Sequence, residues 1–179
     1  MHLSIDGINE IIALVNYWSK SGTTFDLILS SPLSRTLETA RIVAEGLKVP
    51  LEIDNVLIAR SFGDAEGVDL NKVYHWYEGR VYPTQFEPIF ETGESEWEVH
   101  TRASTAIQSF FKRPPGKYLI VSHGNFINAA LHVILGTLPL GRSLPIELAL
   151  ANSGYADLSF DVTAGRWRLK SFNNMEHLG

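Results

Sequence analysis

The chain has 179 residues, of which 45% are hydrophobic, and a formal net charge of −5 at pH 7. This length and composition suit one globular domain, which we expect to span residues 1–179. The acidic balance excludes a uniform positive field, so neither nucleic acid nor a membrane surface is expected as a partner. The chain has no cysteine, which excludes disulfides and thiolate sites, and it shows no signal peptide or apolar run of membrane-spanning length. A soluble, cytoplasmic protein is therefore predicted.

The first third of the chain alternates between helix and strand patterns. Apolar residues including Ile12 recur at helical spacing between Ile8 and Trp18, after the turn-forming pair Asp6-Gly7. The apolar run Phe25–Ser30 predicts a buried strand that ends at a serine-proline breaker. A second helix then extends to about residue 47, and a short strand is expected over residues 51–53.

The rest of the chain contains an irregular stretch and then returns to order. Glycines and prolines interrupt residues 59–96, which we interpret as an insertion-like functional excursion. The patterns that follow predict helices over 98–111 and 124–135 and strands over 118–122, 155–160 and 166–172. This order favours an α/β fold, a three-layer α/β/α sandwich with a mostly parallel central sheet.

Two strand exits carry polar residues suited to an anion. Ligands of such sheets bind outside the carboxyl ends of the strands. Arg35 follows one exit, where its guanidinium can bind two phosphate oxygens, although a surface ion pair with Glu38 explains it equally well. His123, Gly124 and Asn125 follow another exit and open a helix, whose N-terminus attracts anions. A lone histidine there more often fills a strand end, but together with Arg35 it predicts a phosphomonoester site.

Several ordered motifs resemble the histidine phosphatase superfamily, the phosphoglycerate mutase-like branch 1. They are residues 29–40, with serine, proline, arginine and a later threonine-alanine, and the segments 3–7, 93–95, 102, 122–125 and 152–154. The resemblance implies that Arg35, Arg60, His123, Gly124 and Asn125 bind the substrate phosphate, with Arg35 and His123 also acting in catalysis. It implies a phosphohistidine mechanism in which a carboxylic acid protonates the leaving oxygen, with no cofactor and no metal.

The chain departs from the family pattern at two places. The family's nucleophile lies in an Arg-His-Gly motif at the end of a first central strand, before the segment that here is 3–7, and the printed sequence contains neither. His2 is a poor replacement, because it falls after the missing motif at a terminus. The family's acid glutamate is replaced by Ala59, and Glu66 and Glu94 are candidate substitute acids, although each is as well explained by a role in loop structure.

The missing strand has a structural consequence. Its neighbours would carry unpaired backbone groups and exposed apolar faces. Three explanations stay open: the gene encodes residues upstream of those printed, another segment or a second chain supplies the strand, or the fold has rearranged. Ala59 weighs against truncation as the whole explanation.

Three functions compete on these observations. The chain is a phosphatase or mutase of the family whose activity is impaired, a non-catalytic phosphate-binding pseudophosphatase, or an interaction module that docks a protein through its aromatic region 74–90. The expected ligand is a small phosphate ester or inorganic phosphate, and a homodimer is considered as the assembly.

Overall fold

The computed structural model describes residues 2–69, 84–140, 144 and 146–179. It divides into two compact units. The first unit comprises Met1–Ile58, Arg113–Gly124 and Leu148–Gly179, and the second comprises Ala59–Lys112 and Asn125–Glu147. The expectation of one domain stays a prediction beside this division, and part of the aromatic region 74–90 lies outside the described residues.

Helix α1 (Ile5–Lys20) begins earlier than its apolar periodicity predicts. The Ser4 side chain accepts a hydrogen bond from the backbone N–H of Gly7, so Ser4 is the N-cap and Asp6 lies in the first turn. The prediction of a turn at Asp6-Gly7 is therefore wrong. The buried face of α1 consists of Ile11, Leu14 and Trp18, whereas Ile12, which the periodicity placed on it, is 45% exposed.

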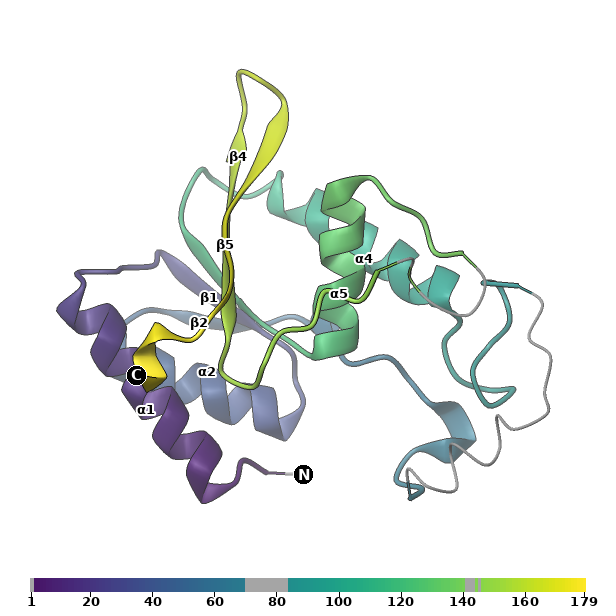
Figure 1. Ribbon diagram of the computed structural model, residues 1–179, viewed down its shortest axis with the longest axis horizontal. Coiled ribbons are helices and arrows are strands. Elements are labelled where there is room, and N and C mark those ends of the chain that lie inside the picture. The colour runs from purple at the N-terminus through teal and green to yellow at the C-terminus, as the bar shows by residue number, and fades with distance from the viewer. Residues whose placement is uncertain (1, 70–83, 141–143, 145) are drawn as a thin grey trace. The chain divides into compact units, whose positions relative to one another are not determined.

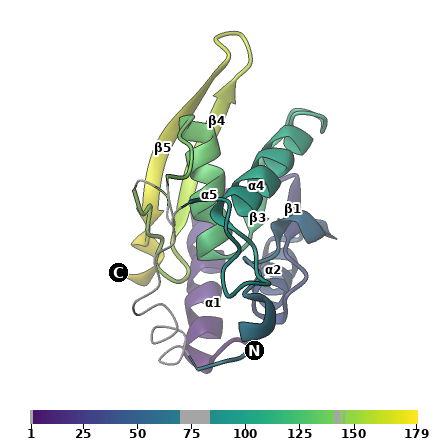
Figure 2. The same cartoon turned by 90° about the vertical axis from the view of Figure 1, so that its right-hand side faces the viewer.

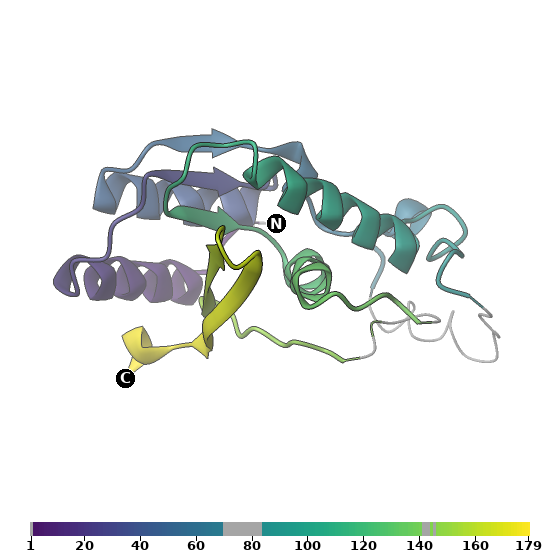
Figure 3. The ribbon, with the colours of Figure 1, turned by 90° about the horizontal axis from the view of Figure 1, so that it is seen from above.

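A parallel three-stranded sheet forms the centre of the first unit. It contains β1 (Leu27–Ser30), β2 (Leu51–Ile53) and β3 (Tyr118–Val121) in the order β2-β1-β3, and Figure 3 shows the three strands running in one direction. Helix α2 (Ser34–Leu47) connects β1 to β2 and ends where Lys48 takes the left-handed conformation. Figure 1 shows α1 and α2 side by side, and their apolar faces pack on β1. These elements confirm the α/β class and the parallel sheet.

The C-terminal strands form a separate antiparallel hairpin. Strands β4 (Tyr155–Asp161) and β5 (Arg166–Asn174) pair with each other and make the long ribbon visible in Figure 2. Among the described strands, β3 pairs with β1 alone, and all four of its residues are only half-buried. One edge of β3 thus lacks a strand partner in the described part of the chain.

The described residues also form three short 3₁₀ helices. They are η1 (Asn55–Leu57), η2 (Gly63–Ala65) and η3 (Glu176–Leu178). The hydroxyl of Tyr17 on α1 donates a hydrogen bond to the Glu176 carboxylate, and this bond raises the pKa of Tyr17 to about 12. The C-terminal η3 is thereby attached to α1.

The second unit is built around α4 (Glu96–Phe110) and most of α5 (Gly124–Leu135). Ser95 and Glu98 form a capping box, in which each side chain accepts a hydrogen bond from the other residue's backbone N–H, so α4 begins two residues before its predicted start. The irregular segment before α4 folds back on itself. A Cβ at Gly63 would lie 2.2 Å from Thr92 Oγ1, and Gly63 has a positive φ of 56°. Only glycine fits this backbone approach.

Candidate functional site

The two predicted strand exits meet at one edge of the parallel sheet. Ser30 at the end of β1 pairs in register with Val121 at the end of β3, and the Ser31 N–H donates to the Val121 carbonyl at 3.0 Å. Ser30 and Ser31 are fully buried. Because parallel strands end at a common edge, the residues that follow β1 and β3 are brought together.

Arg35 and His123 are in direct contact at this edge. Arg35 lies in the first turn of α2, and its Nη2 is 2.8 Å from Nδ1 of His123. The other ring nitrogen of His123, Nε2, is 2.8 Å from Ser31 Oγ, and the residue is 7% exposed. Two residues chosen from the sequence as parts of one site therefore form one cluster in the first unit.

Glu38 is not the partner of Arg35 in this structure. The Glu38 carboxylate accepts a hydrogen bond from the Leu3 backbone N–H at 3.0 Å and pairs with the His2 side chain. The Leu3 N–H and then His2 lower the pKa of Glu38. His2 lies on the surface in this ion pair, its side chain 80% exposed.

Gly124 and Asn125 form the first turn of α5, at the end of the first unit and the start of the second. A Cβ at Gly124 would meet no atom within 4 Å, so open space surrounds this position. The Asn125 side-chain oxygen accepts hydrogen bonds from the N–H groups of Phe126, at 2.8 Å, and Arg60, at 3.3 Å. The side-chain oxygen of Asn125 therefore links the start of α5 to the backbone at Arg60. The side-chain amide nitrogen has the donors that the predicted phosphate role requires.

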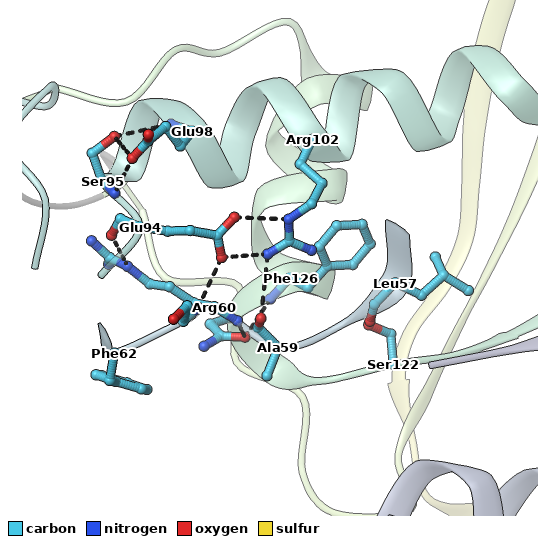
Figure 4. A network of polar contacts seen from close by, with 12 residues as sticks. Leu57, Ala59, Arg60, Phe62, Glu94, Ser95, Glu98, Arg102, Ser122 and Phe126 are labelled. Carbon is cyan, nitrogen blue, oxygen red and sulfur yellow. Dashed lines mark hydrogen bonds and ion pairs between the residues drawn. The ribbon is translucent and has the colours of Figure 1, made fainter. Parts of the chain in front are cut away.

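Arg60 belongs to a polar network of the second unit, which Figure 4 shows from close by. Its Nε donates to the Glu94 carbonyl at 2.9 Å, and its Nη1 forms an ion pair with Glu96. The Arg60 side chain is only 13% exposed. Glu96 thus neutralises an arginine that the sequence assigned to phosphate, and that assignment stays a prediction.

Glu94 occupies the centre of the same network. Its carboxylate accepts hydrogen bonds from Nε and Nη2 of Arg102, at 2.8 and 2.7 Å, and from the Ser61 N–H at 2.9 Å. Burial opposes ionisation of Glu94, but the bonds from Arg102 and Ser61 outweigh it and lower its pKa. Arg102 also donates to the Ala59 carbonyl and lies over the Phe126 ring. The geometry favours Glu94 as a structural anion.

Glu66, the other candidate substitute acid, accepts a hydrogen bond from the Phe62 N–H at 2.8 Å. This bond closes the loop that contains η2, in agreement with the loop role considered for Glu66. Its assignment as an acid stays a prediction.

Two contacts of the site could not be chosen from the sequence. Ser31 was part of the recognised motif but had no assigned role, since a serine beside a strand end is common. Glu96 carried no signal beyond its place in the first turn of a helix. Among the described residues, no group of three His, Asp or Glu side chains gathers as metal ligands do, and no described helix is long and apolar enough to cross a bilayer.

Comparison with known proteins finds one family and many relatives. The family model described as "Histidine phosphatase superfamily (branch 1)" matches residues 1–175. An uncharacterized phosphatase, PhoE, of Bacillus subtilis is 32% identical over 157 residues, which are 87% of this chain and 74% of the relative. A probable phosphoglycerate mutase, GpmB, of Yersinia pestis is 29% identical over 159 residues, covering 84% and 72% of the two chains.

Solved structures share the fold. A mycobacterial glucosyl-3-phosphoglycerate phosphatase in complex with inorganic phosphate aligns with a TM-score of 0.78 at 22% identity, over 99% of this chain and 90% of the other. YhfR of Bacillus stearothermophilus gives the same TM-score and identity over 99% and 87% of the chains.

Proposed function

Because this chain belongs to the histidine phosphatase superfamily, we propose that it binds phosphate monoesters or inorganic phosphate at Arg35 and His123, with impaired turnover. The contact between Arg35 Nη2 and His123 Nδ1 at the common strand edge is the observation that carries this proposal. A guanidinium offers paired donors to phosphate oxygens, and the first turn of α5 at Gly124 adds backbone N–H groups.

The other predicted ligands, Arg60 and Asn125, belong to the second unit. The proposal therefore rests on Arg35 and His123 of the first unit alone. The assignment of Arg60 and Asn125 to phosphate stays a prediction from the family resemblance.

Impaired turnover is supported by residues of the second unit. The methyl side chain of Ala59 cannot donate a proton, and Glu66 and Glu94 both accept backbone N–H groups. Glu94 is further held as an anion by Arg102. We therefore place phosphate binding ahead of catalysis, and a non-catalytic pseudophosphatase is the second candidate.

The proposal is tested by thermal unfolding with and without phosphate. A ligand at 100 times its Kd stabilises the folded state by about 2.7 kcal/mol, which raises Tm by several degrees. Arg35→Ala combined with His123→Ala should abolish the shift. Arg168→Ala, which removes an exposed arginine on β5, is the matched control and should keep it. An equal shift in all three proteins would refute the site.

Turnover separates the two candidates. The same proteins are incubated with an aryl phosphate from acid to neutral pH, and released phosphate is measured. Slow hydrolysis that depends on Arg35 and His123 favours an impaired phosphatase. Binding without hydrolysis favours the pseudophosphatase.

A further inference from the structure

The second unit contains a buried histidine that the candidate phosphate site does not use. His100 lies on the buried side of α4 with Val99 and Ala103, and it is only 8% exposed. Its Nδ1 is buried, and no described residue offers that atom a hydrogen bond. The Trp97 ring stacks on the imidazole, with centroids 6.2 Å apart and planes at 29°. His100 is therefore packed as an aromatic ring in the interior of this unit.

The buried Nδ1 makes a positive charge on the His100 ring unfavourable. An imidazolium carries an N–H on both nitrogens, so its Nδ1–H would be buried without an acceptor among the described residues. A cation over the Trp97 ring gains some attraction, but burial outweighs it. Burial accordingly lowers the pKa of His100 below its ordinary value of 6.5.

A second buried histidine adds to this effect. His132 on α5 is the titratable group of the described chain whose charge acts on His100, and a positive charge there also lowers the pKa of His100. The His132 ring is held in place by Thr137 Oγ1, 2.5 Å from its Nδ1, and by the Ile146 carbonyl, 2.6 Å from its Nε2. The two imidazoles therefore disfavour charge on each other.

The other neighbours of His100 supply no compensating negative charge. Glu96 lies one turn before His100 on α4, but its carboxylate pairs with Arg60. Phe86, in the segment before α4, is uncharged and packs on Trp97 with centroids 5.2 Å apart. No carboxylate in the described part of the chain therefore raises the pKa of His100.

We propose that His100 is an acid-sensitive switch of the second unit, in which uptake of one proton expels the ring from the buried side of α4 and loosens this unit. The proton comes from solvent, the ring nitrogen that lacks one takes it, and no covalent bond breaks. His100 and Trp97, which covers it, then exchange their mutual packing for water. This inference is independent of phosphate binding, so it stands or fails apart from the proposed function.

The direction of the pH effect follows from the lowered pKa of His100. As the pH falls, the exposed ring of the opened unit takes its proton first, near the ordinary value of 6.5. The second unit therefore keeps its full stability above pH 6.5 and loses part of it as the pH falls below that value. The loss levels off below the folded-state pKa. One proton limits the rise of the opening equilibrium constant to about 10-fold per unit of pH.

Amide hydrogen exchange of the full chain measures this loosening. Protection factors, corrected for the intrinsic pH dependence of exchange, are compared at pH 7.5 and pH 5.5. We expect the α4 amides of Ala103 and Ile107 to lose protection severalfold at pH 5.5, with about 10-fold as the limit for one proton. Equal protection at the two pH values would overturn the proposal.

His100→Phe and His177→Phe form a matched pair of variants. Phenylalanine keeps an aromatic ring beside Trp97 but takes no proton, so His100→Phe should abolish the loss of protection in acid. His177 also has a buried Nδ1 without a described partner, and burial lowers its pKa too, but it lies in the first unit. His177→Phe should therefore keep the loss in α4. A loss that persists in His100→Phe, or that disappears equally in both variants, would contradict the switch.

NMR titration of the wild-type imidazole keeps the proposal testable if His100→Phe fails to fold. The Cε1–H signal of His100 should titrate in the folded protein with a midpoint below pH 6.5. The loss of α4 protection should begin at a higher pH than this midpoint, because the opened form takes the proton first. A folded-state midpoint at or above pH 6.5 would overturn the role of His100.

Discussion

Replacing Glu94 with glutamine tests the polar network of the second unit. The carboxylate accepts two hydrogen bonds from Arg102 and one from the Ser61 N–H. Glutamine keeps one acceptor oxygen, but its NH₂ group meets the donors of Arg102. Each lost charge-assisted bond is worth about 1.5–3 kcal/mol, and water repairs part of the loss because the two side chains are 23% and 17% exposed. We expect Glu94→Gln to lower the free energy of unfolding by about 2–3 kcal/mol at pH 7.

The pH dependence of this difference has a definite sign. The folded-state pKa of Glu94 lies below its ordinary value of 4.5, so its contribution is fully present above that value. The contribution is lost as pH falls through the folded-state pKa, and the wild type and the variant should then converge. Urea unfolding at pH 7 and at several values below 4.5 measures this.

Asp161→Asn provides the control for that experiment, since it removes the charge of an exposed pair with Arg168. This variant should lower the free energy of unfolding by less than about 1 kcal/mol. The role of Glu94 as a stabilising anion is refuted if Glu94→Gln lowers the free energy of unfolding no more than the control does. It is also refuted if the loss is the same at pH 7 and in acid.

Three further predictions concern backbone and capping. Gly63→Ala should lower the free energy of unfolding by roughly 2 kcal/mol or more, because its Cβ would overlap the Thr92 segment. Gly22→Ala, also at positive φ but in open space, should lower it by only about 1 kcal/mol. The urea unfolding midpoints of the two variants measure this difference. Ser95→Ala should cost about 1 kcal/mol in the same assay by removing the capping box of α4. The backbone amide of Ile120 should exchange with deuterium faster than that of Leu119. In the parallel ladder the Leu119 N–H points toward β1, whereas the Ile120 N–H points toward the edge of β3 that has no strand partner among the described residues. Equal exchange rates would contradict this.

Local sequence patterns predicted most of the fold because burial imposes strict periodicity on the first unit. The continuous apolar run of β1 marks a strand whose last three residues are buried, whereas the similar run of β3 is only half-buried. The polar residues Arg35 and His123 follow these two strands at their shared carboxyl end. The start of α1 was missed because Asp-Gly is common both in turns and in first helical turns, and only the Ser4 cap decides between them.

Side-chain partners were harder to predict, since they depend on which donors and acceptors meet in space. Arg60 was assigned to phosphate by resemblance, but Glu96, with no motif of its own, pairs with it. Glu66 and Glu94 were chosen because they are carboxylates near Ala59 in the sequence. Their backbone partners, the N–H groups of Phe62 and Ser61, could be identified only from the folded loop. Sequence gives the residue type, whereas loop closure decides whether a carboxylate is available for proton transfer.

The availability of an acid for proton transfer should also decide which phosphate esters the protein hydrolyses fastest. A leaving oxygen of an alkyl ester needs a proton as it departs, and a positioned acid contributes about 10²–10⁴-fold to rate. An aryl oxygen leaves as a weak base and needs the acid less. With alanine at position 59 and Glu94 held as an anion, any turnover should therefore favour aryl over alkyl phosphates.

Ala59→Glu is the matching variant, because it places a carboxyl at the position where the family resemblance puts the acid. We expect it to raise hydrolysis of an alkyl phosphate by about 10²-fold or more and that of an activated aryl phosphate far less. Initial rates of released phosphate for both esters measure the ratio, with Ala59→Gln as the control of equal size that cannot serve as an acid. An equal gain for both esters, or an equal effect of glutamine, would show that proton delivery is not what limits this protein.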